Sequence, residues 1–312
     1  MYRIIILLLV LLLSVPFAAA SPLTIGVLLI EDSVPFYVAE QEGFFRENGV
    51  EVELIPFLSA LERDSALAAG AIDGALSDPV GAILFDKGNG LFKITALCLG
   101  KKPAEGVFAI LSSPKSDIVE VEQLKNVQIA VSNATIIEYV TDRMLEEQGF
   151  KPSEVKKIEV KKMPIRMQML LSDSVSAATL PEPLASIAVG NGARVVLTDR
   201  ESKESLSQTV ILFRANILDE RKDAVAAFFK AYDHAVAAIN RDPERFRGLF
   251  LEKGRIPPFL SDTYRIPVFP KVEPFSRSLY NPIINWLKKK KLVEHVPYEK
   301  MVSTDFIGEQ VK

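Results

Sequence analysis

Polar side chains follow five predicted strands at the points where those strands end. The segments are residues 31–37, 57–59, 77–79, 132–135 and 181–183. Ligands of open α/β sheets bind beyond the carboxyl ends of the strands. The helices that follow present free N–H groups and a partial positive charge at the same place. We therefore predict a binding site for a small polar molecule. The alternative is that Ser33, Ser59 and Asp78 only cap the helices that follow them.

The sequence offers little for catalysis. It contains neither a nucleophile-elbow motif nor a Gly-x-x-x-x-Gly-Lys phosphate loop. Asp78 and Glu182 have the chemistry of an acid/base pair, but nothing beside them supplies a nucleophile. Two histidines, His234 and His295, and the single Cys98 make a zinc site improbable. We predict a protein that is not an enzyme, with no catalytic residue, no metal ligands and no cofactor.

The charge balance argues against nucleic acid as a partner. The formal net charge is -3, and 25% of the residues are charged, which gives no basic field for nucleic acid. The lysine run at residues 288–291 is interpreted as a solvated helix end. A single cysteine excludes an internal disulfide. Cys98 lies in an apolar run at residues 94–99, and we interpret it as a buried strand thiol.

The N-terminus has the anatomy of a secretory signal peptide. Arg3 precedes an aliphatic run at residues 4–13, and the small residues 18–21 follow. The run is shorter than the roughly 20 residues that span a bilayer, so we interpret residues 1–20 as a signal peptide and not as an anchor. We predict cleavage between Ala20 and Ser21. The residue directly after that site is Ser21 and not a cysteine, so we expect an exported, periplasmic protein without a lipid anchor.

Strand and helix patterns alternate from residue 23 onward. Alternating apolar residues at 50–55 predict a strand, and Ser59 and Glu62 have capping-box spacing for the next helix, which Gly70 ends. The same alternation restarts after Gly106 and continues to a strand at residues 209–214. This order predicts an α/β protein with parallel sheets and helices on both sheet faces.

A long helix is predicted at residues 218–240. Its apolar residues recur at helical spacing and form one stripe, which comprises Val225, Phe228, Phe229, Tyr232, Val236 and Ile239. The last substantial helix is predicted at residues 281–290 and carries Trp286, the only tryptophan.

A weak internal repeat relates residues 70–79 to residues 174–183. The matches are Ile72 with Val175, Ala75 with Ala178 and Asp78-Pro79 with Glu182-Pro183, the last after one inserted residue. Each copy reads as a strand followed by an acid-proline step into a helix. The repeat indicates two lobes of similar construction.

A family resemblance covers nearly all of the chain after residue 20. Residues 35–39, 42–45 and 48–53 resemble the opening of the alkanesulfonate, nitrate, taurine and thiamine-pyrimidine binding proteins of ABC importers. Residues 57–59, 66–73 and 77–78 continue this likeness in register, and residues 181–183 resemble a later acid-proline step. The likeness is most specific over residues 35–78.

The resemblance implies a type II periplasmic-binding-protein fold, with two doubly wound lobes joined by two crossovers. We expect residues 22–107 and 217–312 to form the first lobe and residues 108–216 the second, with the strands near 107–111 and 209–214 bridging them. Its implied partners are a small-molecule ligand and membrane permease subunits, and we expect a monomer. Carried over position by position, the ligand-binding residues are Asp32, Ser33, Phe36, Tyr37, Ser59, Asp78, Asn133, Thr135 and Glu182.

Departures from the family pattern leave the ligand open between an aminopyrimidine, a sulfonate and a nitrate-like anion. Ser132-Asn133 replaces a Gly-Ser pair that is common in the family, and Ser176 stands where an aspartate is frequent. Ionised Asp78 and Glu182 would disfavour an oxyanion and favour a ligand with N–H donors. Phe36 and Tyr37 would stack on a ring, although Phe36 also fits a core position and Glu182 also fits a hinge.

The alternative function is an enzyme of the same fold that acts on a small cyclic metabolite, in pyrimidine or menaquinone-precursor synthesis. The eukaryotic pyrimidine-forming members carry a cysteine-rich motif, which a chain with Cys98 alone lacks. The menaquinone-pathway members are usually cytoplasmic, which disagrees with the predicted signal peptide.

The signal-peptide prediction is tested by N-terminal sequencing of the exported protein. We expect the mature chain to begin at Ser21, because the small residues before it suit signal peptidase. An intact Met1 in a cytosolic or membrane fraction would contradict this prediction.

Overall fold

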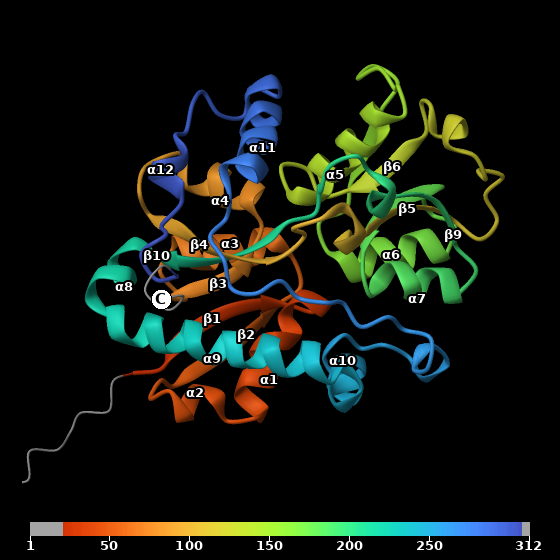
Figure 1. Cartoon of the computed structure of the whole chain (residues 1–312). Coiled ribbons are helices and arrows are strands. Elements are labelled where there is room, and N and C mark those ends of the chain that lie inside the picture. Colours follow the sequence, from red (N-terminus) through yellow and green to blue (C-terminus); the bar gives the residue numbers. More distant parts are fainter. Residues whose placement is uncertain (1–20, 308–312) are drawn as a thin grey trace, which may run out of the picture.

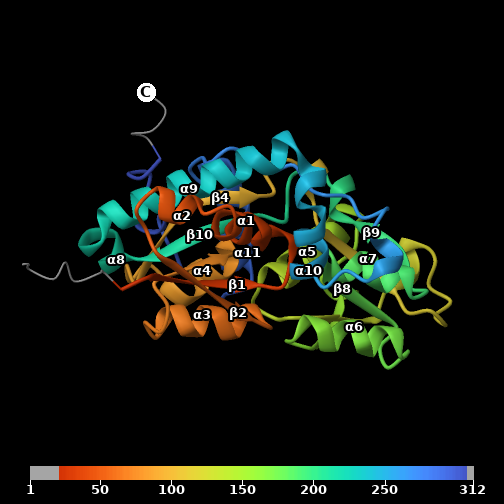
Figure 2. The same cartoon turned by 90° about the horizontal axis from the view of Figure 1, so that it is seen from below.

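The computed structural model describes residues 21–307, so the predicted signal peptide at residues 1–20 lies outside the described residues. The described chain forms two α/β lobes, each built around one five-stranded sheet (Figure 1). Each sheet is covered by helices, and the second lobe is formed by the middle of the chain (Figure 2). The predicted pair of doubly wound lobes is confirmed.

The two sheets have the same topology. The first has the order β2-β1-β3-β10-β4, with β1 (Leu23–Leu28), β2 (Val52–Phe57), β3 (Gly74–Ser77), β4 (Phe92–Leu99) and β10 (Thr209–Arg214). The second has the order β7-β6-β8-β5-β9, with β5 (Phe108–Ser112), β6 (Gln128–Val131), β7 (Lys156–Glu159), β8 (Ala177–Pro181) and β9 (Arg194–Thr198). The repeated segments of the sequence therefore contain β3 and β8, which occupy the third position of each sheet.

Neither sheet is fully parallel, so the prediction of parallel sheets holds for four strands of each sheet and fails for one. β10 runs antiparallel between β3 and β4, and β5 runs antiparallel between β8 and β9. The cause is the connection between the lobes, because each crossover delivers one reversed strand to a sheet. The predicted lobe boundary at residue 216 also differs from the sheet topology, because the hydrogen bonds of β10 lie in the first sheet.

Most helices belong to the first lobe. They are α1 (Val34–Gln41), α2 (Phe44–Glu47), α3 (Ala60–Ala68), α4 (Pro79–Asp86), α8 (Ala215–Glu220), α9 (Lys222–Arg241), α10 (Arg247–Lys253), α11 (Arg277–Lys289) and α12 (Tyr298–Met301). The second lobe has α5 (Ile136–Glu147), α6 (Met163–Leu171) and α7 (Leu184–Gly190). The predicted helix at 218–240 is broken at Arg221 into α8 and α9.

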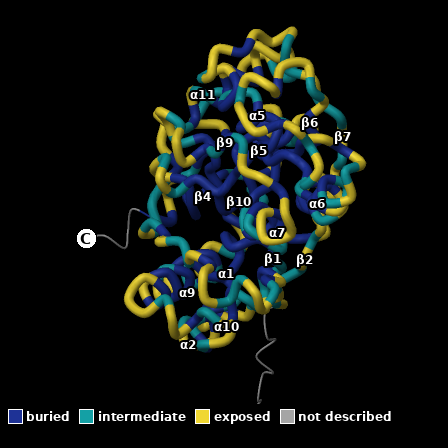
Figure 3. The backbone as a smooth tube through the Cα atoms, turned by 90° about the vertical axis from the view of Figure 1, so that its right-hand side faces the viewer, coloured by how far each residue is buried: buried dark blue, intermediate teal, exposed yellow. Residues whose placement is uncertain are grey.

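The core of the first lobe includes the apolar stripe of α9. All six predicted stripe residues are buried, and the Phe228 ring lies 5.2 Å from Phe213 of β10 and 5.6 Å from Phe45. Buried residues follow β4, β10 and β5 through the middle of the molecule, and exposed residues lie on the outer loops (Figure 3). The aromatic packing attaches α9 to the back of the first sheet and leaves the strand ends free to form a site.

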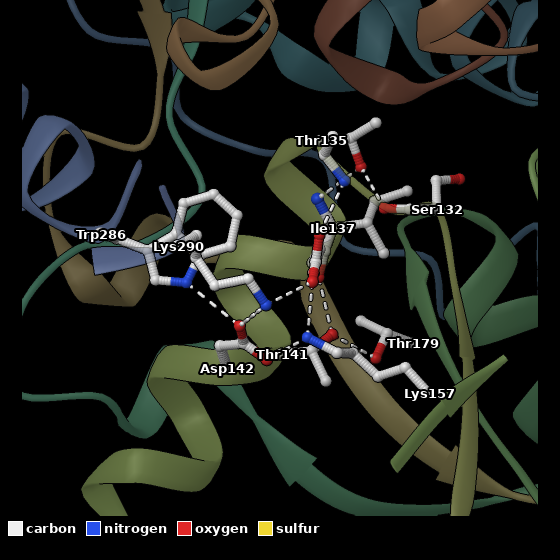
Figure 4. Close-up of polar contacts among 11 residues, drawn as sticks. Ser132, Thr135, Ile137, Thr141, Asp142, Lys157, Thr179, Trp286 and Lys290 are labelled. Carbon is white, nitrogen blue, oxygen red and sulfur yellow. Dashed lines mark hydrogen bonds and ion pairs between the residues drawn. The ribbon is translucent and has the colours of Figure 1, made fainter. Parts of the chain in front are cut away.

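A contact between α5 and α11 joins the lobes in addition to the two crossovers. Trp286 of α11 is buried, packs edge-to-face on Tyr139 of α5 at 5.5 Å, and donates its indole N–H to Asp142 Oδ2 at 3.1 Å. Lys290 Nζ, just after α11, bonds Glu138 Oε1 at 2.8 Å and lies 3.3 Å from Asp142 Oδ2. Figure 4 shows these groups converging on α5. We call this contact the α5–α11 seam.

Within the second lobe, Lys157 of β7 supports the same carboxylates. Its Nζ lies 2.6 Å from Glu138 Oε1 and 2.6 Å from Asp142 Oδ1. Burial raises the pKa of Glu138, but hydrogen bonds from Lys157 and Lys290 outweigh burial, and the pKa of Glu138 is lowered. The seam therefore holds the carboxylates of Glu138 and Asp142 between lysines of both lobes.

We predict that Lys290→Ala lowers the free energy of unfolding by about 1 kcal/mol, because a partly buried ion pair is lost while Lys157 still pairs Glu138. Trp286→Ala is expected to cost about 3–5 kcal/mol, because a large buried ring is removed. Urea unfolding measures both. Lys288→Ala changes an exposed lysine of the same helix and is the control; an equal loss in Lys288→Ala and Lys290→Ala would contradict the ionic contribution of the seam.

Candidate functional site

A small cavity lies between the lobes at the carboxyl ends of the strands, and we call it the central cavity. Its volume is about 40 Å³. Its polar lining comprises Arg63, Ser77, Asp78 and Thr209 from the first lobe and Ser132, Thr135 and Lys161 from the second. Apolar residues such as Ile30, Leu76, Phe108 and Ile137 complete the wall. The position agrees with the rule that ligands of α/β sheets bind at the strand ends.

The first-lobe wall is organised by Arg63 of α3. The guanidinium is buried and bonds Asp64 Oδ1 through Nε at 2.8 Å and Ser77 Oγ through Nη2 at 2.7 Å. Asp78 Oδ2 lies 3.6 Å from Nη2, while Asp78 Oδ1 accepts the N–H of Gly81 at 2.8 Å as the cap of α4. Burial and the nearby Asp64 charge raise the pKa of Asp78 to about 6, although Arg63 opposes this. One cation therefore serves two buried carboxylates.

Gly81 allows this close packing. A Cβ at position 81 would lie 2.4 Å from Asp64 Oδ2, so a larger residue would force the carboxylate away from Arg63. The glycine in the first turn of α4 brings the helix N-terminus against the cluster.

The second-lobe wall contains a buried cation without a carboxylate partner among residues 21–307. Arg166 of α6 is 0% exposed, and its hydrogen bonds go to the carbonyls of Val160 and Thr179 and to Ser132 Oγ. Burial lowers the pKa of Arg166 to about 9. Ser132 lines the central cavity, so a positive charge lies directly behind this wall.

The loop between β6 and α5 is held from both sides. Thr135 Oγ1 donates to the carbonyl of Ser132 at 2.8 Å and accepts the N–H of Ile137 at 3.2 Å (Figure 4). Glu138 Oε2 accepts the N–H of Ala134 at 2.7 Å. Because Glu138 also takes part in the α5–α11 seam, the loop that lines the cavity is connected to the other lobe.

Three predicted site residues line cavities between the lobes. Asp78 and Thr135 line the central cavity, and Asn133 and Thr135 line a neighbouring cavity of about 430 Å³ that also includes Asp64 and Leu61. Asn133 is exposed. The structure thus brings the predicted ends of β3 and β6 together.

Asp32 and Ser33 lie beneath the site. Asp32 Oδ2 accepts a hydrogen bond from Thr209 Oγ1 at 2.7 Å, and its Oδ1 has no partner among the described residues. Ser33 donates to the carbonyl of Leu28 at 2.6 Å. Asp32 therefore supports Thr209, which lines the cavity, while Ser33 closes the turn after β1.

Three further predicted residues are used in packing or capping. Phe36 is 0% exposed and packs on Tyr232 at 5.0 Å, so it belongs to the core. Tyr37 lies under Lys253, whose Nζ is 4.9 Å from the ring centroid. Ser59 accepts the N–H of Glu62 at 3.2 Å and caps α3.

Glu182 lies at a different cavity, which is lined by residues of β5, α7 and β9 and by Leu260. Its carboxylate accepts hydrogen bonds from the N–H and Oγ of Ser186 at 3.1 and 3.0 Å and lies 4.0 Å from Arg200. Burial raises the pKa of Glu182. Its charge therefore does not line the central cavity.

The sequence prediction missed Arg63, Lys161, Arg166 and Thr209, and it included Ser77 and Ser132 only as members of the predicted strand-end segments. One signal was present, because Arg63 and Arg166 each precede a buried leucine by four residues, Leu67 and Leu170. Residues four apart share a helix face, so both arginines fall on the buried faces of their helices.

Two kinds of feature are absent from residues 21–307. No group of three or more His, Cys, Asp or Glu side chains is placed to hold a metal ion. No described helix has both the length and the apolar composition to cross a membrane.

We predict that Asp32 makes stability depend on pH. Burial raises its pKa to about 6, so the folded state retains a proton that the unfolded chain loses near pH 4. The free energy of unfolding should therefore fall as pH rises from about 4 to about 7. Asp32→Asn removes this titrating group. Between about pH 4 and pH 7 the free energy of unfolding of the variant should therefore rise by about 1–3 kcal/mol relative to that of the wild type.

The measurement is urea unfolding at several pH values. Asp219→Asn alters an exposed aspartate and is the control. If the wild type and Asp32→Asn show the same pH dependence, the assignment of the titration to Asp32 is wrong.

Comparison with solved structures shows the same fold in binding proteins. The ligand-binding component of an ABC-type import system from Staphylococcus aureus, with zinc bound, is 17% identical; the match covers 93% of this chain and 99% of that chain, with a TM-score of 0.77. The alkanesulfonate-binding protein SsuA from Xanthomonas axonopodis pv. citri, bound to MOPS, is also 17% identical. This match covers 92% of this chain and 99% of that chain, with a TM-score of 0.77. The periplasmic nitrate-binding protein NrtA from Synechocystis is 16% identical. This match covers 91% of this chain and 69% of that chain, with a TM-score of 0.64.

No curated protein sequence matches the chain. The predicted family is nevertheless shown by a model of the NMT1/THI5-like family, which matches residues 31–246. This segment includes every polar residue that lines the central cavity and more than half of the chain. The chain therefore belongs to the NMT1/THI5-like family.

Proposed function

We propose that the chain is the extracytoplasmic solute-binding component of an ABC importer and not an enzyme. The observation that carries the proposal is the central cavity, whose polar lining comes from both lobes. A solute that contacts both lobes binds best when they are closed and shifts the population to that state. The predicted signal peptide supports a periplasmic protein, and the likeness to the import-system component from Staphylococcus aureus and to SsuA from Xanthomonas axonopodis supports an importer's permease subunits as partners.

The described residues give little support to the enzyme alternative. Cys98 is 1% exposed, and burial raises its pKa, so the thiol is not an activated nucleophile. Asp78 is occupied as a helix cap and Glu182 lies elsewhere. The two carboxylates considered for acid/base chemistry therefore do not share a site.

We propose an anionic solute, of the sulfonate or nitrate kind, rather than an aminopyrimidine. Arg166, which has no carboxylate partner within residues 21–307, places a positive charge behind Ser132, and Lys161 lines the cavity itself. In the first lobe, Arg63 offsets part of the Asp78 charge. The sequence favoured a ligand with N–H donors only if Asp78 and Glu182 both faced it. Of these two residues, only Asp78 lines this cavity.

A thermal-shift panel of nitrate, methanesulfonate, taurine and an aminopyrimidine tests this proposal. A solute present at a hundredfold excess over its Kd stabilises the folded state by about 2.7 kcal/mol, so we expect an anion to raise the Tm. Lys161→Gln should weaken the anion about tenfold, because one charge-assisted hydrogen bond is lost. Asp78→Asn should leave its affinity unchanged or raise it, because a like charge is removed.

Lys151→Gln, an exposed lysine of the second lobe, is the control and should change nothing. A shift with the aminopyrimidine alone, abolished in Asp78→Asn, would contradict the anionic solute and keep the binding function. Mass spectrometry should recover the bound solute unchanged, whereas a chemically altered product would favour the enzyme.

A further inference from the structure

A second cavity between the lobes is almost entirely apolar, and we call it the apolar groove. Its volume is about 360 Å³, within the range of small-molecule sites. It is lined by Leu29, Phe57 and Leu58 at the ends of β1 and β2, by residues of α6 and α7, and by the segment 254–259. The segment after α10 reaches from the first lobe to α7 of the second (Figures 1 and 2).

The groove is open to solvent although its lining is apolar. Leu58 is 42% exposed and Phe259 is 56% exposed. The Phe259 ring packs closely against α7 at Gly190. A Cβ at Gly190 would lie only 2.2 Å from a carbon of the ring. Pro257 and Pro258 precede Phe259 and restrict its backbone. A fixed aromatic residue thus forms one wall of an exposed apolar hollow.

Among the residues that the structure describes, one cation and no carboxylate line the groove. Arg255 is exposed, and its side chain has no hydrogen bond or ion pair within residues 21–307. The other polar lining side chain, Asn191, donates to the carbonyl of Ile187 at 2.8 Å. The chemistry of the groove is therefore an apolar surface with one unpaired positive charge.

We propose that the apolar groove binds a small amphiphilic acid, with its apolar body in the groove and its anionic group on Arg255. The groove is separate from the central cavity, and the two share the wall residue Met163. An occupant of the groove contacts α6 and α7 of one lobe and the strand ends of the other. It therefore favours the closed arrangement without entering the central cavity.

Isothermal titration of the protein without its signal peptide with butanoate, hexanoate, octanoate and octan-1-ol tests this proposal. We expect the affinity of the acids to rise about threefold to fourfold for each added methylene, because each one is removed from water. Octanoate should bind about threefold more tightly than octan-1-ol, as expected for one exposed ion pair. Affinity independent of chain length would overturn the proposal.

Two variants locate the site, and one serves as the control. Arg255→Gln should remove the preference for octanoate over octan-1-ol and keep the dependence on chain length. Leu58→Asp should weaken octanoate at least tenfold, because it places a carboxylate in the groove. Val119→Asp makes the same kind of change at a residue that is 55% exposed and lies outside the groove, and it should have no effect. An equal loss in Val119→Asp, or an unchanged preference in Arg255→Gln, would overturn the proposal.

The solute of the central cavity provides an independent measurement. Titration with nitrate or methanesulfonate should be unaffected by Arg255→Gln and Leu58→Asp, because neither residue lines that cavity. Failure of the groove to bind octanoate would therefore leave the proposed import function standing. Failure of the central cavity to bind nitrate or methanesulfonate would likewise leave the proposed groove site standing.

Discussion

A buried guanidinium in each lobe determines how the candidate site is built. Moving such a cation out of water costs several kcal/mol even after relaxation, so its hydrogen bonds must be satisfied inside the protein. Arg63 satisfies this requirement with Asp64 and Ser77, which ties α3 to the end of β3. Arg166 does so with two carbonyls and Ser132, which ties α6 to β8 and to the end of β6. The hydrogen bonds of these two arginines hold in place the strand ends that line the central cavity.

The two cations differ in their partners, and this difference sets the charge of the cavity. Arg63 is matched by the carboxylates of Asp64 and Asp78, whereas Arg166 has only neutral acceptors among the described residues. With Lys161 on the same side, the second lobe supplies the positive wall. Screening by water is weak inside a closed cleft, so this asymmetry favours an anion that approaches the loop between β6 and α5.

The same topology in both sheets explains why the two walls face each other. Each lobe contributes the ends of its second and third strands, β1 and β3 in one and β6 and β8 in the other. The exchanged strands β10 and β5 bring the two sheets into one continuous molecule, and the α5–α11 seam adds a third connection through Trp286. Movement of the lobes thus requires changes at the crossovers and at the seam together.

The sequence by itself determined the local structure. The caps Ser59 and Asp78, the apolar stripe of α9 and the acid-proline repeat depend on neighbours close along the chain, and the structure contains them as predicted. The segments that end at the cavity were also visible, because helix caps and strand ends share the same residue types. The predicted site was only partly assembled, with Asp78 and Thr135 lining the central cavity.

Only the tertiary structure decided which polar residues are buried. Phe36 and Glu182 looked suitable for a ligand, but packing on α9 and hydrogen bonding to Ser186 use them elsewhere. Arg63 and Arg166 looked like ordinary helix arginines, which are usually exposed. The fate of a long charged side chain depends on partners far apart in the sequence, such as Ser77 for Arg63 and Ser132 for Arg166. No local pattern specifies those partners, because they meet only when the two sheets have formed.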